Sequence, residues 1–317
     1  MATSGVYSFS VVRDDIVREA MLNIGKLGEA DNPSAQEMVD CARKLNMLCK
    51  QWMARRDFAP GLKVWTRRQA DLFLDYTKGS YSLGPSGDNW TTQSWTQQQT
   101  AASLALATTI NVPNANINVG DYVGIQLDAG NLFWTTVATL VGSTQITITT
   151  GIPSSAANGN WVYNYTTKAQ RPLHIEAISL RDSSFSDIPI KIYTLQDYAL
   201  TSSKAQIGFV SDPTAAYYQA DLINGTLFVD VPGCQDVTKR LRIYYFEPIQ
   251  DFVNATDNPE YPQEWYAALS WGLTKLIAPM FNVPFTKDME ENLNGSVTMA
   301  REAYSETTTL YFQPGND

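Results

Sequence analysis

The sequence predicts an α+β fold: a helical core (an N-terminal helical hairpin plus C-terminal helices), an antiparallel β region, and an inserted all-β sandwich or barrel domain. Two observations lead to this prediction. Helical apolar patterns occur near both ends of the 317-residue chain, and strand-like alternation lies between them. In addition, residues 79–167 contain no Lys or Arg, and the only acids in residues 89–167 are Asp121 and Asp128. Such a shift in composition indicates a domain inserted into a host fold.

These patterns divide the chain into three parts. We expect a discontinuous host domain formed by residues 1–88 and 170–305, an inserted β-domain formed by residues 89–169, and an extended C-terminal tail formed by residues 306–317. A length of 317 residues fits two domains of ordinary size. A hydrophobic content of 44% is ample for packed interiors.

The chain is acidic, with a formal net charge of -9. Proteins that grip nucleic acid neutralise phosphates with a basic surface, so this charge argues against gripping DNA but allows DNA to slide past. No run approaches the roughly 20 apolar residues of a membrane span, and the N-terminus lacks the pattern of a secretory signal, so we expect no membrane association. Cys41 and Cys49 are interpreted as buried apolar residues in a reducing compartment.

Two amphipathic helices are expected near the N-terminus. The first runs from about Asp14 to Leu27, and the second begins at Ser34, where Glu37 completes a capping box. Their apolar stripes consist of Ile16, Val17, Ala20, Met21, Ile24 and Leu27 in the first, and Met38, Cys41, Ala42, Leu45, Leu48, Cys49 and Trp52 in the second. Because each helix has one apolar face and the connection is short, we expect an antiparallel hairpin.

Strand patterns follow these helices. Residues 70–74 alternate, Lys78-Gly79 turns the chain, and residues 81–83 resume the alternation, which predicts a β-hairpin closing at residues 84–87. Residues 98–107 are the one candidate helix in the charge-poor block. The strands expected in that block are residues 122–127, 132–140, 145–149 and 161–165.

The alternating pattern returns after the block. Asn224-Gly225 predicts a two-residue hairpin turn between two of the later strands. A helix is expected after Pro262 and should end at Pro279, and a last helix should run from about Thr286 to Ser305. The later strands are expected at residues 173–180, 188–193, 217–223, 226–231 and 240–246.

The sequence offers no catalytic constellation. Its one histidine, His174, lies in a strand pattern, where a structural role is the usual one, and no zinc-ligand spacing is present. No nucleophile elbow, phosphate loop or dinucleotide-binding glycine pattern occurs. Neighbouring acids such as Glu290 and Glu291 diverge by about 100° around a helix, so they do not converge on a substrate. We therefore predict a protein that is not an enzyme, with no catalytic, metal-binding or cofactor-binding residues and no cofactor.

Two basic pairs are candidates for contacts between molecules. Arg55 with Arg56 and Arg67 with Arg68 could face DNA in a channel, or they could neutralise the acidic surface of a neighbouring subunit. Two short pairs are a weak electrostatic footprint for DNA, which favours the inter-subunit interpretation.

Aromatic residues give two further candidate surfaces. Trp90 and Trp95 are candidates for the surface of the insert, where aromatic faces could stack on sugars, and a place in the core of the β-domain is the alternative. Leu310, Tyr311 and Phe312 form an apolar strip on the C-terminal tail, which indicates a docking segment.

Short motifs recur in a particular order along the chain. They are Leu45-Asn46-Met47-Leu48 with Trp52, the stretch Tyr-Ser-Leu-Gly-Pro-Ser-Gly-Asp at 81–88, Arg171-Pro172 before a strand, the strand at 240–248, and Tyr261-Pro262 before Ala267-Ala268. In this order the chain resembles the podovirus-type head-to-tail adaptor family of bacteriophages, the portal-proximal tail accessory or head completion proteins. The resemblance covers about residues 10–88 and 170–305 and leaves the insert outside.

The resemblance implies a structural virion protein that forms a homo-oligomeric ring beneath the phage portal and connects the DNA-filled head to the tail. The implied partners are the portal protein ring, a downstream tail or nozzle protein, and copies of the chain itself in a dodecamer. Double-stranded DNA would pass through the channel without specific binding. The implied location is the head–tail junction of the virion, and the host cytoplasm during assembly. Leu310, Tyr311 and Phe312 would contact the portal.

Two other classes of function remain open. A carbohydrate-binding adhesin of the tail would use the tryptophans of the insert, and glycan-dependent quenching of Trp fluorescence would support it. A cell-wall hydrolase would need a convergent acid pair, which the sequence does not offer, and muralytic assays would reveal it.

Overall fold

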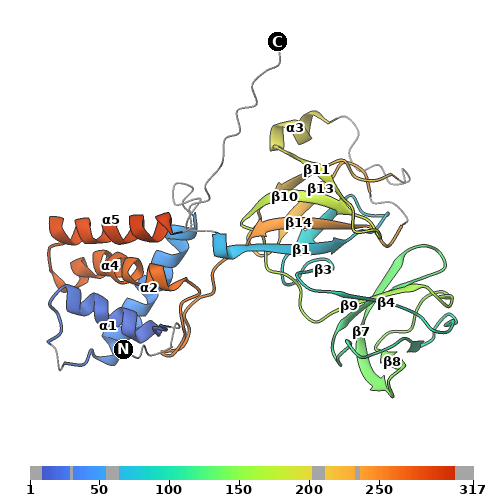
Figure 1. The fold of residues 1–317 in the computed structure, drawn as a ribbon, viewed down its shortest axis with the longest axis horizontal. Coiled ribbons are helices and arrows are strands. Elements are labelled where there is room, and N and C mark those ends of the chain that lie inside the picture. The colour runs from blue at the N-terminus through green and yellow to red at the C-terminus, as the bar shows by residue number, and fades with distance from the viewer. Residues whose placement is uncertain (1–8, 29–30, 55–63, 202–210, 233–235, 304–317) are drawn as a thin grey trace, which may run out of the picture. The chain divides into compact units, whose positions relative to one another are not determined.

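The structure, a computed structural model, describes residues 9–28, 31–54, 64–201, 211–232 and 236–303. It is a mixed α+β protein, which confirms the predicted fold class. The chain divides into two compact units (Figure 1). The helical unit comes from residues 1–66 and 248–317, and the β unit comes from residues 67–247.

The helical unit brings together helices from the two ends of the chain. Helix α4 contacts α1, α2 and α5, and α1 also contacts α2 (Figure 1). The described helices are α1 (Arg13–Asn23), α2 (Ala35–Ala54), α4 (Tyr266–Ile277) and α5 (Lys287–Glu302), with 3-10 turns at Val64–Thr66, Gln263–Trp265 and Ala278–Phe281. The N-terminal helices and the C-terminal helices therefore share one core, as the sequence predicts.

The ends of these helices follow local sequence signals. Ser34 and Glu37 form the predicted capping box: Ser34 N donates to Glu37 Oε2 (2.9 Å) and Glu37 N donates to Ser34 Oγ (3.3 Å). Helix α1 ends at Asn23, earlier than predicted, because Gly25 adopts a left-handed conformation with φ of +68°. Helix α4 ends at Ile277, two residues before Pro279, as expected.

Aromatic rings and two thiols fill the centre of the helical unit. Trp265 is fully buried, and its ring lies 6.1 Å from Trp52 and 5.7 Å from Trp65, measured between centroids. Cys41 and Cys49 are both buried on α2. Burial raises the pKa of each thiol to about 11.

The raised thiol pKa values predict slow alkylation in the folded protein. A shift from about 9 to about 11 lowers the thiolate fraction at pH 8 about 100-fold, and burial slows access further. We expect iodoacetamide to modify Cys41 and Cys49 at least about 100-fold faster in urea than in native buffer. Peptide mass spectrometry would measure each cysteine separately. Rapid labelling of either residue in native buffer would contradict a closed core around α2.

An eight-stranded sheet forms the larger part of the β unit. Its strand order is β2-β13-β12-β11-β10-β14-β1-β3, and it curls into a near-closed barrel. Its strands are β1 (Arg67–Phe73), β2 (Ser80–Leu83), β3 (Trp90–Thr91), β10 (His174–Arg181), β11 (Asp187–Tyr193), β12 (Ala215–Gln219), β13 (Gly225–Val229) and β14 (Arg240–Phe246). Only β11 and β12 are parallel among the described pairs of this sheet, and the short helix α3 (Leu195–Leu200) lies in the connection between them.

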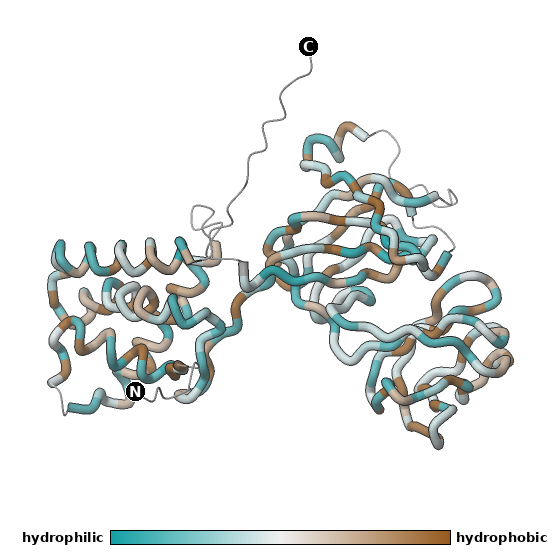
Figure 2. Tube along the Cα trace, viewed as in Figure 1, coloured by the Kyte–Doolittle hydropathy of each residue, from teal (hydrophilic) through white to brown (hydrophobic). Residues whose placement is uncertain are grey.

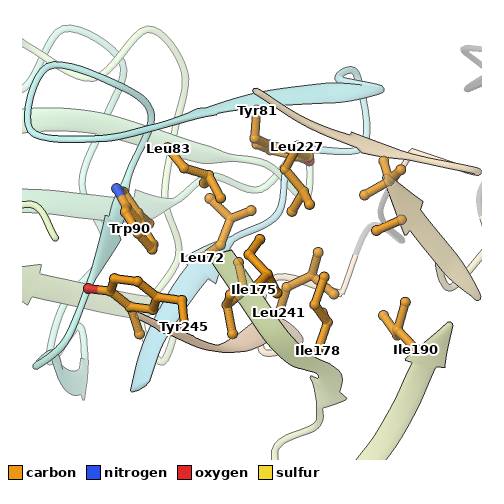
Figure 3. Packing of buried hydrophobic residues seen from close by; sticks show 14 of the residues in the cluster. Leu72, Tyr81, Leu83, Trp90, Ile175, Ile178, Ile190, Leu227, Leu241 and Tyr245 are labelled. Carbon is orange, nitrogen blue, oxygen red and sulfur yellow. The ribbon is translucent and has the colours of Figure 1, made fainter. Parts of the chain in front are cut away.

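The core of this sheet is formed by side chains that alternate along the strands. Leu241, Ile243 and Tyr245 of β14 are fully buried, and the residues between them are partly exposed. Figure 2 shows the same alternation of hydrophobic and hydrophilic residues along the chain. Figure 3 shows Leu72, Trp90 and Tyr245 within this cluster of buried side chains.

One predicted hairpin is wrong in its pairing, whereas the other is confirmed in the antiparallel pairing of β12 with β13 but has a different turn. Strands β1 and β2 are not partners: β1 pairs with β14 and β3, and β2 pairs with β13. Alternation within each strand shows which face is apolar but does not specify the partner strand. Asn224-Gly225 is not a two-residue turn, since Gln219 pairs with Thr226 and Gly225 lies inside β13. Gly225 is needed there for a different reason: a Cβ would lie 2.0 Å from the Tyr218 hydroxyl oxygen.

A second, six-stranded antiparallel sheet forms the rest of the β unit. Its order is β4-β9-β6-β7-β8-β5, and it encloses its own aliphatic core, which includes Val123, Ile146 and Val162. Its strands are β4 (Trp95–Gln98), β5 (Thr109–Asn111), β6 (Tyr122–Gln126), β7 (Leu132–Val141), β8 (Gln145–Ile148) and β9 (Trp161–Tyr165). The four strands predicted for this block are confirmed, whereas residues 98–107 form no helix.

Candidate functional site

The two ends of the charge-poor block meet in the structure. Thr91 Oγ1 donates to the carbonyl of Thr167 (2.8 Å), and Ala169 N donates to the carbonyl of Trp90 (3.1 Å). The chain thus leaves the eight-stranded sheet and returns to it at one point. Trp90 and Ala169 themselves lie in the core of that sheet, and both sheets belong to one compact unit. The predicted domain limits at residues 89 and 169 stay a prediction.

The turn at residues 84–88, which carries part of the resemblance, is held by the Asp88 carboxylate. Ser82 N donates to Asp88 Oδ2 (2.8 Å), and Lys78 Nζ lies 2.6 Å from Asp88 Oδ1. Asp88 N donates back to the carbonyl of Ser82 (2.7 Å). Because the carboxylate is occupied by these partners, the turn has a structural role.

Lys168 connects the block to this turn. Its ammonium donates to the carbonyl of Gly87 and lies 5.1 Å from the centroid of the Tyr122 ring. Burial lowers the pKa of Lys168, although the nearby Asp88 acts in the opposite direction. Lys168 therefore joins the turn of the eight-stranded sheet to strand β6 of the six-stranded sheet.

An aromatic cluster fills the space between the two sheets. Phe73 of β1 lies against Trp134, Tyr163 and Tyr165, with centroid distances of 4.9, 5.2 and 6.3 Å. A cavity of about 50 Å³ remains beside this cluster, lined partly by Phe73, Lys78 and Trp134. Small-molecule sites usually enclose about 300–1,000 Å³, so this cavity is too small for a substrate.

A buried ionic cluster lies at the same end of β1. Asp71 accepts two hydrogen bonds from Arg242, at 2.9 and 3.0 Å, and lies 3.6 Å from Arg240. The Arg240 guanidinium also covers the rings of Phe73 and Tyr163, at 5.9 and 5.6 Å. Asp71 thus links both arginines of β14 to β1, although Arg240 Nε is buried without a hydrogen-bond partner among the described residues.

The described ranges contain no group of three His, Cys, Asp or Glu side chains that could hold a metal ion. His174 is exposed, and its ring stacks on Phe246 with centroids 6.4 Å apart. Within the same ranges, none of the helices has the length and apolar character needed to cross a membrane.

The structure describes one of the two basic pairs, Arg67 with Arg68. Arg67 Nε lies 2.7 Å from Glu176 Oε2, and Arg68 Nε lies 2.6 Å from Glu247 Oε1, so both arginines have acidic partners within the chain. An assignment to a channel or to a neighbouring subunit must compete with these ion pairs, and it stays a prediction. Arg55 and Arg56 lie outside the described residues.

The two tryptophans proposed for the surface of the insert differ sharply. Trp90 is 0% exposed in the core of the eight-stranded sheet, so its assignment to the insert surface is wrong. The reason is that Trp90 lies in strand β3, which pairs with β1 of the eight-stranded sheet. Trp95, on edge strand β4, is partly exposed and stays a surface candidate. Leu310, Tyr311 and Phe312 lie outside the described residues.

Sequence reasoning missed a surface on the six-stranded sheet. Strands β5, β7 and β8 present a row of threonines outward, of which Thr109 and Thr139 both pair with Thr147. Alternation of Thr with Ile at residues 146–149 is a signal that could have indicated this face.

No protein-family model matches the chain, and no curated protein matches it.

Proposed function

We propose that this chain is a structural virion protein, a head-to-tail adaptor that forms a ring beneath a phage portal and connects the head to the tail. One observation supports it most: the opening helices α1 and α2 and the closing helices α4 and α5 form one body, although more than 200 residues separate α2 from α4. The resemblance requires this arrangement, because its motifs lie at both ends of the chain. Opening and closing helices in unrelated lobes would have excluded it.

The place of the insert supports the same proposal. In sequence, 82 residues (89–170) lie between the motif at residues 81–88 and the Arg171-Pro172 motif. Hydrogen bonds from Lys168 to Gly87 and from Ala169 to Trp90 bring them together, so the block interrupts the motifs without separating them in space. An adaptor interrupted by an extra domain accounts for this geometry.

The proposal predicts that the C-terminal tail determines attachment to the portal. Helix α5 ends at Glu302, so a chain ending at Ser305 retains every described helix and strand. We expect this truncation to keep its far-UV circular dichroism and melting temperature but to bind portal rings at least about tenfold more weakly, because it loses three apolar side chains. Sedimentation of mixtures with purified portal rings, followed by electron microscopy, would measure binding.

A matched control separates the apolar strip from the length of the tail. A full-length chain with Leu310→Ser, Tyr311→Ser and Phe312→Ser should fail in the same way as the truncation. Unimpaired assembly of both variants would contradict the docking role of the tail. Failure of the unaltered chain to join any portal ring would contradict the adaptor function itself.

A further inference from the structure

The outer surface of strands β5, β7 and β8 forms three cross-strand rows of uncharged side chains. The register places Thr139, Thr147 and Thr109 in one row, and Val141, Gln145 and Asn111 in the next. Beyond the end of β8, Thr149 bonds to Thr136. We call these eight residues the threonine face: Thr109, Asn111, Thr136, Thr139, Val141, Gln145, Thr147 and Thr149.

Three pairs of polar side chains on the threonine face are hydrogen-bonded to one another. The hydroxyls of Thr139 and Thr147 lie 2.6 Å apart, and those of Thr136 and Thr149 lie 3.0 Å apart. In the remaining row, Gln145 Nε2 donates to Asn111 Oδ1 (2.7 Å). Burying such groups costs less than burying unpaired ones, because little hydration has to be replaced. Threonine also loses little rotamer freedom on burial, since its χ1 is already restricted.

The threonine face itself carries no charged side chain. Residues 89–167 contain two of the chain's 32 acidic residues and none of its 23 basic residues. Asp121 is 0% exposed, whereas Asp128 is exposed and accepts hydrogen bonds from Ser155, Ala157 and Asn160. Most of the net charge of -9 therefore lies outside residues 89–167, and Asp128 is the one exposed acid within them.

Apolar side chains extend outward at the two ends of strand β8. Val141 pairs with the first residue of β8, and it is 43% exposed. Leu106 lies past the other end of β8, where its N–H donates to the carbonyl of Ile152 (2.7 Å). Leu106 is 79% exposed and has a φ of +67°, a conformation disfavoured for leucine. Backbone strain that displays an apolar side chain to solvent points to a contact.

We infer that the threonine face is a contact surface between copies of this chain. Two copies that each carry a net charge of -9 repel one another, and the repulsion is smallest where neither copy has surface charge. A basic or acidic partner would gain no electrostatic attraction from this face, whereas a second copy avoids a penalty there. The apolar side chains Val141 and Leu106 lie at opposite ends of β8. Val141 of one copy can therefore meet Leu106 of the next, and such head-to-tail contacts close rings. The inference rests on the proposed function in one respect, because a ring beneath the portal would hold many copies of the chain side by side.

The test introduces one acid into the centre of the face. We expect the full-length chain to self-associate in sedimentation velocity, more strongly as salt rises from about 50 to about 500 mM, because salt screens the repulsion between copies. Thr147→Glu should weaken this association at least tenfold. Thr96→Glu, an exposed threonine on edge strand β4 of the same sheet, should change it less than about twofold. If Thr147→Glu fails to fold, Thr109→Glu on edge strand β5 repeats the test.

Leu106→Asn provides an independent readout. Asparagine tolerates the left-handed conformation, so we expect the melting temperature of the β unit to rise by about 2–4 °C. The same change removes an exposed apolar side chain, so self-association should weaken. A purely structural role for Leu106 would raise the melting temperature and leave association unchanged.

The outcomes separate this inference from the proposed function. The contact would be overturned if Thr147→Glu and Thr96→Glu self-associate equally strongly. It would also be overturned if the unaltered chain stays monomeric both alone and on portal rings. A glycan that binds the unaltered chain but not Thr147→Glu, without self-association, would overturn it in favour of an adhesin. Self-association that is sensitive to Thr147→Glu, in a chain that binds no portal, would support the contact and contradict the adaptor.

Discussion

Trp90→Ala should lower the free energy of unfolding of the β unit by about 3–5 kcal/mol, the usual cost of removing a buried tryptophan side chain. Trp90 is fully buried, with its ring centroid 5.1 Å from that of Tyr245, and it lies among Leu72 and Leu83 in the core (Figure 3). A void of this size cannot collapse easily, because the surrounding strands are fixed by their ladder hydrogen bonds. Urea denaturation followed by far-UV circular dichroism would measure the change.

Trp95→Ala is the matched control for this substitution. Trp95 lies on edge strand β4 of the six-stranded sheet and is partly exposed to solvent. We therefore expect Trp95→Ala to lower the free energy of unfolding by about 1 kcal/mol or less. Equal effects of the two substitutions would contradict the assignment of Trp90 to the core of the eight-stranded sheet.

The second large effect concerns Asp71. Asp71→Ala should destabilise the β unit by about 3–5 kcal/mol, because removing one partner leaves charged groups buried without compensation. The side chain of Asp71 is 11% exposed, and those of Arg240 and Arg242 are 14% and 12% exposed. Both guanidinium groups would lose their acidic partner, and a cross-strand link between β1 and β14 would be lost with it. Thermal and urea denaturation would measure the loss.

Two further variants serve as controls for Asp71→Ala. Glu291→Ala breaks an ion pair with Lys287 on the exposed surface of α5 and should cost only a few tenths of a kcal/mol, roughly the worth of an exposed helical pair. In the double variant Asp71→Ala with Arg242→Ala, the second substitution should cost less than it does alone, since its partner is already missing. Additive effects would show that Asp71 and Arg242 are not coupled.

Local patterns in the sequence were sufficient to predict helices α1, α2, α4 and α5 and many of the strands, although not the short helix α3. The capping box at Ser34 and Glu37, and the prolines around α4, act within a few residues, so they are visible in sequence alone. Four strands of the charge-poor block were predicted nearly to the residue, because turn residues separate them, whereas the short strands β4 and β5 were not predicted.

Strand partners could not be predicted in the same way. Strand β1 pairs with β14, which begins 173 residues after Arg67, and no local signal specifies a partner at that distance. Asn224-Gly225 has the composition of a tight turn, but Gln219 pairs with Thr226 and the ring of Tyr218 lies against Gly225, contacts that the dipeptide alone does not reveal. Composition likewise gave no sign that Trp90 pairs with Leu72 in the eight-stranded sheet.

The threonine face could likewise be predicted only in part from the sequence. A row of threonines can be found in the sequence, but the mutual pairing of their hydroxyls depends on the register of β5, β7 and β8. The apolar strip Leu310, Tyr311 and Phe312 is a property of sequence alone and depends on the portal-binding experiment.

The meeting of Thr91 and Thr167 has a practical and an evolutionary consequence. A folded module whose own termini lie close together could be exchanged for residues 92–166 at these two attachment points, provided that it also covers Phe73, which packs against Trp134, Tyr163 and Tyr165. This position is therefore suited to a fluorescent reporter or an affinity handle. For the same reason, related chains could acquire, replace or lose such a module through recombination while keeping their helices and barrel unchanged.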